Sequence, residues 1–226
     1  MDWERLITNL LSGFPITVLL VAASGIVGNA AAVLVALART SEKVWLRWPA
    51  LAFTTVIRGT PLIVQIFLIY YGLGQFREVR QSFLWPILKD PLWCAFLALS
   101  ISTAAYSGEV LRGAIANVPR GLVEAGKSVG LGKWQIRLTI VLPLAFRQSL
   151  PVLANETVLL LKASAIVFTI TVRDIMGEAN VFRAQTFRVY EPLLSAAVLY
   201  LALTFTIRRG FALAERRMNR WRERVG

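Results

Sequence analysis

Five blocks of mostly apolar residues limit the possible folds of this sequence more than any other feature. Each block is about 20 residues long, the length that an α-helix needs to cross roughly 30 Å of hydrocarbon. A helix satisfies its own backbone hydrogen bonds, which lipid cannot do, so blocks of this kind form helices. We therefore predict an all-α membrane protein in which residues 1–226 form a single transmembrane domain. Its five predicted spans are residues 14–38, 51–73, 92–114, 150–172 and 192–213.

The distribution of Lys and Arg predicts the direction in which the chain crosses the membrane. With the N-terminus outside, the predicted cytoplasmic segments hold 16 of the 25 Lys and Arg residues. Lys and Arg accumulate in the cytoplasmic loops of membrane proteins. We therefore predict an outside N-terminus and a cytoplasmic C-terminus. The predicted cytoplasmic tail is especially rich in arginine, with Arg208, Arg209, Arg216, Arg217, Arg220, Arg222 and Arg224.

The net charge of +12 follows from the same distribution. Acidic residues such as Asp174 cancel the outer cations, so the excess charge lies on the cytoplasmic side, where anionic lipid headgroups attract it. We therefore do not expect nucleic-acid binding. The chain has no histidine and only one cysteine, Cys94, which removes the commonest general base and any thiolate metal cluster. We expect no catalytic site, metal site or cofactor in this chain.

The connection between the third and fourth blocks is long and contains apolar residues at helical spacing. Glycines at 121, 126, 130 and 132 interrupt it, which predicts short amphipathic helices joined by a glycine turn. A helix pair that merely rests on the lipid headgroups is an equally compatible interpretation.

Residues 121–128 of this connection match the phosphate-loop pattern G-x-x-x-x-G-K-[ST] letter for letter. A functional phosphate loop lies between a buried strand and a helix. The residues before Gly121 instead leave a predicted membrane helix, and no strand ending in a magnesium-binding aspartate follows. We therefore reject a nucleotide site here.

A longer pattern covers the same connection. Glu124-Ala125-Gly126 is followed by Gly130 and, after nine further residues, by Ile140-Val141-Leu142-Pro143. This resembles the conserved cytoplasmic loop of bacterial ABC importer permeases, E-A-A, three residues, G, nine residues, I-x-L-P, with Gly126 where alanine is usual. The resemblance implies that residues 119–143 form coupling helices that dock on a separate ATPase. The implied coupling residues are Pro119, Gly121, Glu124, Ala125, Gly126, Gly130, Leu131 and Pro143.

Other segments resemble the polar amino-acid branch of these permeases. They are Arg58–Leu62 with Gln65, Tyr106–Gly113 and Asn155–Ser164, and the pattern at 168–174 is similar to the histidine/arginine/opine subunits. Together these matches cover nearly the whole chain and imply the five-helix type I permease fold. They also imply a bacterial inner-membrane subunit, with its N-terminus periplasmic, that imports a polar or cationic amino acid.

The resemblance further implies a set of partners. These are a second permease subunit, identical or homologous, two ATP-binding subunits that hold ATP and Mg²⁺, and a periplasmic substrate-binding protein. The sequence leaves open the substrate and whether the pathway is homodimeric or heterodimeric.

Charged side chains inside the predicted spans are the candidate pathway residues, because each costs at least about 2.5–3.5 kcal/mol to insert. Glu109 and Arg112 are three residues apart on a helix, which favours an internal salt bridge over a pore face. In the first span, Ser24 and Gly28 predict close helix packing. The candidate pathway residues, polar neighbours included, are Arg58, Gln65, Glu109, Asn155, Glu156 and Lys162.

Glu156 is the most suggestive of these residues. Asn155 and Lys162 share one helix face, while Glu156 points about a quarter turn away from Asn155, by the geometry of an α-helix. Its carboxylate could meet a cationic group of the substrate, pair with Arg58, or pair with a partner subunit. Arg58 could instead hold the carboxylate of the substrate, and Gln65, seven residues on, is expected on its face.

One alternative of a different class is an ion-coupled secondary transporter or channel that uses Glu109 and Glu156 as proton or cation sites. Most secondary transporters contain inverted repeats, and no repeat is evident in this sequence. A purely structural membrane scaffold would not explain four charges inside the spans.

Overall fold

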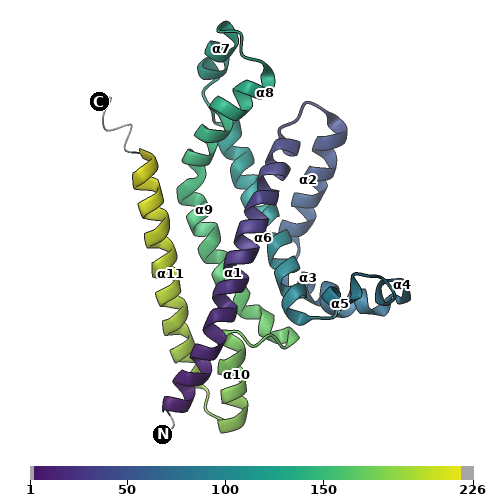
Figure 1. The fold of residues 1–226 in the computed structure, drawn as a ribbon, viewed down its shortest axis with the longest axis vertical. Coiled ribbons are helices and arrows are strands. Elements are labelled where there is room, and N and C mark those ends of the chain that lie inside the picture. The colour runs from purple at the N-terminus through teal and green to yellow at the C-terminus, as the bar shows by residue number, and fades with distance from the viewer. Residues whose placement is uncertain (1–2, 220–226) are drawn as a thin grey trace.

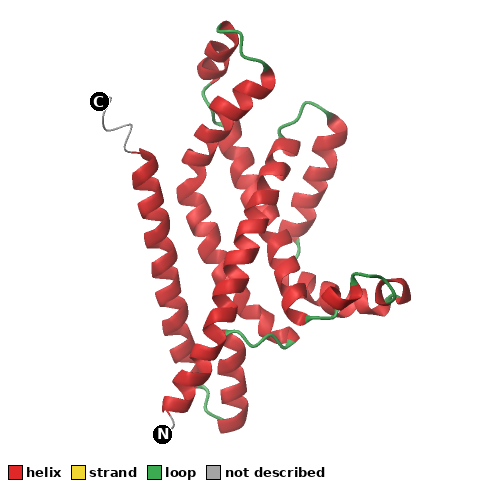
Figure 2. Cartoon of the chain, in the orientation of Figure 1, coloured by secondary structure: helices red, strands yellow, loops and turns green. Residues whose placement is uncertain are grey.

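The computed structural model describes residues 3–219, and every regular element in this range is a helix. Figure 2 shows helices joined by short loops. The predicted all-α membrane fold is therefore confirmed. The tail cations Arg220, Arg222 and Arg224 lie outside the described residues. Four segments are long and apolar enough to cross a membrane, namely α1 (Trp3–Arg39), α6 (Pro91–Ala116), Lys133–Ile170 and α11 (Tyr190–Asn219), and a bent pair within residues 44–75 makes a fifth if counted as one span.

The two ends of the bundle carry different elements (Figure 1). Helices α7 (Arg120–Ser128) and α8 (Lys133–Ile136) lie at one end, together with the C-terminal part of α11. The N-terminal part of α1 and α10 (Ile175–Thr186) lie at the other. We call these the α7 end and the α10 end.

Helices α1 and α6 pack closely because small residues line their contact. A Cβ atom on Gly28 would lie 2.5 Å from the Cβ of Thr103, so only glycine fits this approach. Nearby, the Ser24 hydroxyl donates a hydrogen bond of 3.4 Å to the carbonyl oxygen of Phe96 on α6. The predicted packing role of Ser24 and Gly28 is confirmed.

The second span is broken. Helix α2 (Val44–Gly59) ends before Pro61, and α3 (Leu62–Phe67) then begins in a new direction, with a bend of 106° between the two parts. Pro61 has no N–H to donate and disfavours helical backbone in the residue before it. One continuous helix over residues 51–73 was therefore the wrong expectation. Beyond α3, an arm projects sideways from the bundle (Figure 1) and contains η1 (Leu68–Gly72), η2 (Leu73–Gln75), α4 (Arg77–Arg80) and α5 (Trp85–Leu88).

The fourth span begins earlier than its apolar block. Helix α8 continues without a loop through the π-helical segment η3 (Arg137–Val141) into α9 (Leu142–Ser164) and the 3₁₀ segment η4 (Ala165–Ile170). The last part of the predicted coupling segment is thus the start of the same helical run that crosses the membrane.

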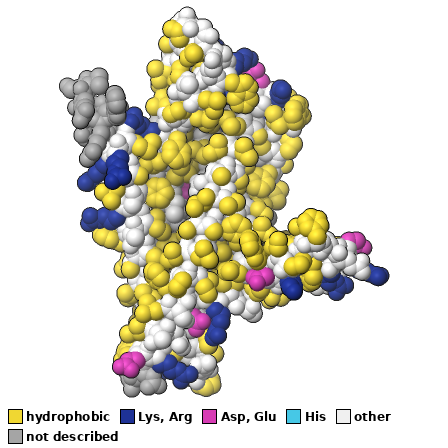
Figure 3. Space-filling view, in the orientation of Figure 1, with side chains coloured by type: hydrophobic (Ala, Val, Ile, Leu, Met, Phe, Trp, Pro, Cys, Tyr) yellow, Lys and Arg dark blue, Asp and Glu magenta, His cyan; other side chains and the backbone are white. Residues whose placement is uncertain are grey.

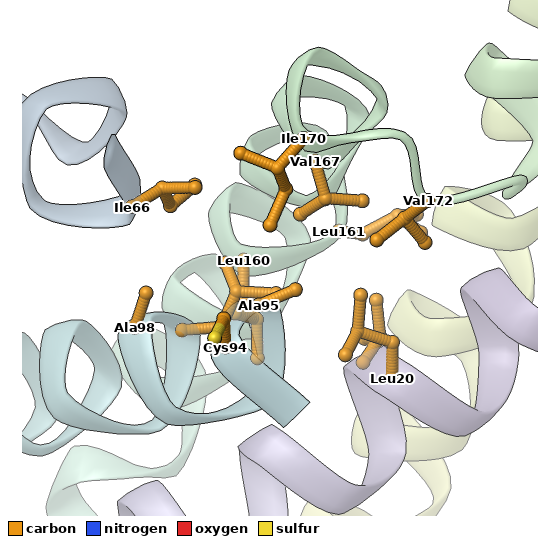
Figure 4. Packing of buried hydrophobic residues seen from close by; sticks show 12 residues of the cluster. Leu20, Ile66, Cys94, Ala95, Ala98, Leu160, Leu161, Val167, Ile170 and Val172 are labelled. Carbon is orange, nitrogen blue, oxygen red and sulfur yellow. The ribbon is translucent and has the colours of Figure 1, made fainter. Parts of the chain in front are cut away.

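The largest buried hydrophobic cluster lies where α1, α3, α6, α9 and η4 meet (Figure 4). Leu20, Ile66 and Leu161 reach it from three of these elements, and the single cysteine, Cys94, is fully buried in it. The cluster fixes α3 against α6 and α9 on the far side of the break. It therefore sets the positions of the walls of the cavity described next.

Candidate functional site

A cavity of about 300 Å³ lies between α2, α3, α6 and α9. Leu99 and Leu160 of the buried cluster form part of its wall. Polar side chains from three separate segments also line it: Thr60, Gln65, Ser102, Thr103, Tyr106, Ser107 and Glu156. The structure thus brings together two of the predicted pathway residues, Gln65 and Glu156, which are far apart in the sequence.

Gln65 is held by the break between α2 and α3. Its side-chain N–H₂ donates to the carbonyl oxygens of Ile57 at 2.8 Å and Thr60 at 3.1 Å, and to the Thr60 hydroxyl at 2.9 Å. Its side-chain oxygen Oε1 is buried and has no hydrogen-bond partner among the described residues. The expectation that Gln65 shares a helix face with Arg58 was wrong, because it assumed an unbroken helix.

Glu156 lies half-buried on α9 and lines the cavity. Within the described part of the chain its carboxylate forms no ion pair. The Ser107 hydroxyl, which lines the same cavity, is also buried without a partner in that part of the chain. The residues that line the cavity therefore include a carboxylate without an ion pair, and an amide oxygen and a hydroxyl without hydrogen-bond partners, among the described residues.

Arg58 lies beside the cavity. Its guanidinium carbon is 5.4 Å from the centroid of the Tyr106 ring, within the range of a cation–π contact. The Tyr106 hydroxyl donates a hydrogen bond of 3.4 Å to the backbone carbonyl of Arg58. Arg58 forms no ion pair with Glu156 among the described residues. Arg58 is thus stacked on Tyr106, and its charge is not neutralised by direct contact with Glu156.

Glu109 lies in a separate cluster of charges between α1 and α6. Its carboxylate accepts from Arg39 of α1 at 3.2 Å and from Arg112 of its own helix at 2.7 Å. The predicted salt bridge with Arg112 is confirmed, and Glu109 does not line the cavity. No sequence pattern pointed to Arg39, because it lies 70 residues from Glu109 in the chain.

Asn155 and Lys162 point away from the cavity that Glu156 lines. Asn155 is exposed and lines a different hollow, of about 240 Å³, together with Arg208 and Glu215 of α11. Lys162 is exposed and forms no ion pair with another described residue. The structure therefore separates these two predicted pathway residues from Gln65 and Glu156.

Most of the predicted coupling segment, residues 119–143, stands at the surface of the α7 end. Pro119, Gly121, Glu124 and Ala125 are exposed, as is Pro143 further along the chain. Large apolar side chains are exposed beside them, including Leu122, Val129, Trp134 and Leu138. Exposed apolar groups of this kind mark a surface that another protein can cover.

Gly126 explains the one departure from the usual loop pattern. It is buried, and a Cβ atom at this position would lie 2.9 Å from Cδ1 of Ile140 and 3.1 Å from Cγ1 of Ile136. The missing side chain therefore lets α7 lie directly against the start of the long helical run.

Gly130 allows the chain to turn back after α7. Its φ angle is +81°, a left-handed conformation that favours glycine. The N–H of Leu131 donates to the carbonyl of Gly126, and that of Gly130 to the carbonyl of Lys127, both at 3.0 Å. This pair of bonds is the Schellman arrangement at a helix C-terminus. Residues 121–128, which match the phosphate-loop pattern, thus lie within helix α7 and not in a loop after a strand.

A polar contact near the α10 end was not predicted from the sequence. Asp174 is fully buried and accepts hydrogen bonds from the N–H of Gly177 at 2.8 Å and from the hydroxyl of Tyr200 at 3.0 Å. Burial raises the pKa of Asp174 to about 6. The next residue, Ile175, donates its N–H to Thr17 of α1 at 3.1 Å. Asp174 therefore links α10 to α11. Its position three residues before Gly177, as a helix N-cap, was the available signal.

Comparison with known proteins adds to this geometry. The model of a family described as "Binding-protein-dependent transport system inner membrane component" matches residues 28–220. The chain is 42% identical to the octopine transport system permease protein OccM of Rhizobium radiobacter, over 94% of this chain and 86% of that protein. It is 36% identical to the histidine/lysine/arginine/ornithine transport system permease protein HisM of Salmonella typhimurium, over 91% of this chain and 88% of that protein. The solved structure of an amino acid ABC transporter with histidines superposes with a TM-score of 0.83 and 31% identity, over 96% of this chain and 99% of that one.

Proposed function

Because this chain belongs to the family of binding-protein-dependent transport system inner membrane components, we propose that its cavity at Gln65 and Glu156 is part of the path of a cationic amino acid or opine. The chain is a multi-pass inner-membrane permease subunit of an ABC importer and not an enzyme. Membership also sets aside an ion-coupled secondary transporter that works alone. An importer of this family works with an ATPase and a substrate-binding protein.

The free acceptors in the cavity carry this proposal. Ammonium and guanidinium groups only donate hydrogen bonds, and their ideal partners are carboxylate and carbonyl oxygens. Glu156 and Oε1 of Gln65 supply one of each within a single cavity, and Ser107 adds a hydroxyl. The relative OccM is named for octopine, and the relative HisM is named for histidine, lysine, arginine and ornithine. Lysine and arginine carry a cationic side chain at neutral pH.

The α7 end is the cytoplasmic end in this proposal, which makes the N-terminus periplasmic and the C-terminus cytoplasmic. Lys127, Lys133 and Arg137 lie in or next to α7 and α8, and the arginines of α11 follow toward the same end. The excess of Lys and Arg at this end supports the orientation. The exposed apolar surface of α7 and α8 is then the docking site for the ATPase, and the ATP and Mg²⁺ that power transport belong to that partner.

A continuous helix provides the route by which the ATPase acts on the cavity. The run from Lys133 to Ile170 contains α8 at one end and Glu156 within the membrane span. At 1.5 Å per residue, Lys133 and Glu156 lie about 35 Å apart along it. A displacement of α8 by the ATPase therefore moves the carboxylate of Glu156 without an intervening loop. A second permease subunit, identical or homologous, completes the pathway in this scheme.

Uptake by proteoliposomes tests the proposal. The transporter is reconstituted with its ATPase and binding protein, and initial uptake of arginine, lysine, histidine and octopine is measured for the native protein and Glu156→Gln. We expect the change to lower uptake of the cationic substrates by about tenfold or more, since a hydrogen bond to a charged group contributes about 1.5–3 kcal/mol. Lys162→Gln, which removes a charge of α9 outside the cavity, is the matched control. Unchanged uptake by Glu156→Gln, with assembly intact, would exclude the cavity from the substrate path.

A further inference from the structure

A second hollow of the molecule is unlike the cavity at Glu156. It is a groove of about 650 Å³ between α1, α9 and α11, on a different face of α9. Its walls run from Val18 to Asn29 on α1, from Phe146 to Leu161 on α9 and from Leu203 to Ala214 on α11. Figure 3 shows hydrophobic side chains over the region between α11 and α1, and Lys and Arg side chains along the outer edge of α11.

The groove offers little to a polar ligand. Its three polar side chains each donate to a carbonyl oxygen of their own helix: Asn29 to Gly25 at 2.7 Å, Thr157 to Leu153 at 2.9 Å and Thr206 to Ala202 at 2.9 Å. A polar substrate in the groove would lose its hydrogen bonds to water without replacing them, which is costly. The surface therefore suits an apolar occupant.

The length of the groove indicates what kind of apolar occupant fits. Its wall on α1 extends over Val18 to Asn29, or about 16 Å at the helical rise of 1.5 Å per residue. This is about half of the roughly 30 Å of hydrocarbon in a bilayer, and so matches the acyl chains of one leaflet. A transmembrane helix of a second protein would need to pack over the full thickness.

A cation lies at one end of the groove. Arg217 follows Ala214 by three residues on α11, which places it on the same helix face and nearer the α7 end. It is exposed and forms no ion pair with another described residue. If the acyl chain of a lipid fills the groove, the phosphate group of that lipid would lie at the level of Arg217 along the membrane normal.

We propose that the groove is a binding site for an anionic phospholipid of the leaflet at the α7 end, with an acyl chain between α1, α9 and α11 and the headgroup at Arg217. Basic residues at the cytoplasmic ends of membrane helices attract anionic headgroups. The occupied groove would fill the space between α11 and the rest of the bundle.

Two pairs of variants test the site. Gly210→Leu fills the groove, since a Cβ atom at Gly210 meets nothing within 4 Å, and Ala202→Leu adds the same bulk to α11 outside the groove. Arg217→Gln removes the proposed headgroup contact, and Arg216→Gln removes the neighbouring cation, which lies on another face of the helix. The complete transporter is incubated with phosphatidylcholine vesicles with or without phosphatidylglycerol, repurified in detergent, and its retained lipid is counted by native mass spectrometry.

We expect Gly210→Leu to lose retained lipid of both kinds, and Ala202→Leu to retain it. Arg217→Gln should weaken phosphatidylglycerol binding about fivefold and leave phosphatidylcholine unchanged, as expected for one arginine at a membrane surface, whereas Arg216→Gln should match the native protein. Equal retention by all four variants would overturn the proposal. A disulfide between two copies of a Cys94→Ser, Gly210→Cys variant would also overturn it, because a second copy would then fill the groove.

Discussion

The guanidinium of Arg39 on α1 donates a hydrogen bond of 3.2 Å to the carboxylate of Glu109 on α6. Because Arg112 holds the other carboxylate oxygen at 2.7 Å, Glu109 joins two membrane helices near the α7 end. The three side chains are only partly exposed. One carboxylate thus pairs with two guanidinium groups, which leaves this partly buried cluster with a net charge of +1.

Glu109→Gln should destabilise the protein, because it leaves two cations without their shared carboxylate. Loss of one partner of a buried polar contact costs about 1–3 kcal/mol, and in a chain of this size each kcal/mol lowers Tm by about 2–4 °C. Thermal unfolding of the purified transporter measures the change. Glu42→Gln removes a far more exposed ion pair, with Lys133, and should change Tm little. A Tm of Glu109→Gln equal to that of Glu42→Gln would contradict the assigned role.

Gly126→Leu should disturb coupling between the ATPase and transport. The new side chain would push α7 away from Ile136 and Ile140, which a Cβ atom alone already approaches to 3.1 Å or less. Gly113→Leu, on α6, adds the same side chain where a Cβ atom meets nothing within 4 Å. We expect arginine uptake to fall severalfold in the first variant and to remain near native in the second, since overpacking costs about 1–3 kcal/mol. Equal uptake in both variants would mean that the α7 packing is not needed.

Lys127→Ala should leave ATP hydrolysis by the assembled transporter largely intact. Lys127 occupies the lysine position of the phosphate-loop pattern, but it lies exposed within helix α7. Its backbone is in a helical conformation and does not form the loop of N–H groups that surrounds a phosphate. The measurement is ATPase activity together with nucleotide binding by the isolated chain. Binding of ATP that disappears with Lys127→Ala would show that the phosphate-loop interpretation is right after all.

Asp174→Asn should reduce the dependence of stability on pH. Burial raises the pKa of Asp174 from 3.8 to about 6, so the folded protein binds this proton more tightly than the unfolded chain. The resulting stability is fully present below the unfolded pKa and is lost as the pH rises through about 6. Native Tm should therefore fall across this interval by more than the Tm of Asp174→Asn. Parallel curves for the two proteins would rule out Asp174 as the titrating group.

Much of this fold is predictable from the sequence, because apolar length dictates which segments cross a membrane. Pattern spacing likewise identified the segment around Glu124 and Gly130. One failure comes from the assumption that each apolar block is one straight helix. Pro61 breaks the second block, so Gln65 does not lie on the same helix face as Arg58. It lines the cavity together with Glu156 instead. Helical periodicity relates residues only within one unbroken helix.

Contacts between distant segments were beyond the reach of the sequence. Arg39 lies just beyond the first predicted span, and no sequence pattern linked it to Glu109 or linked Tyr200 to Asp174. In both cases the partner lies on another helix, and one sequence does not reveal how helices are rotated about their axes. The need for glycine at position 126 could not be predicted either, because it depends on the packing of α7 against Ile136 and Ile140.

Gln65 has two tasks that compete. Its amide N–H₂ group holds the carbonyl oxygens of Ile57 and Thr60, which the broken helix would otherwise leave without partners. Its oxygen meanwhile has no hydrogen-bond partner among the described residues, although Gln65 lines the cavity. A ligand that rotates this amide to gain a better contact would release those carbonyls. Ligand binding in the cavity and the angle between α2 and α3 would therefore influence each other. The Gln65 side chain would then both contact the substrate and change the position of the cavity wall.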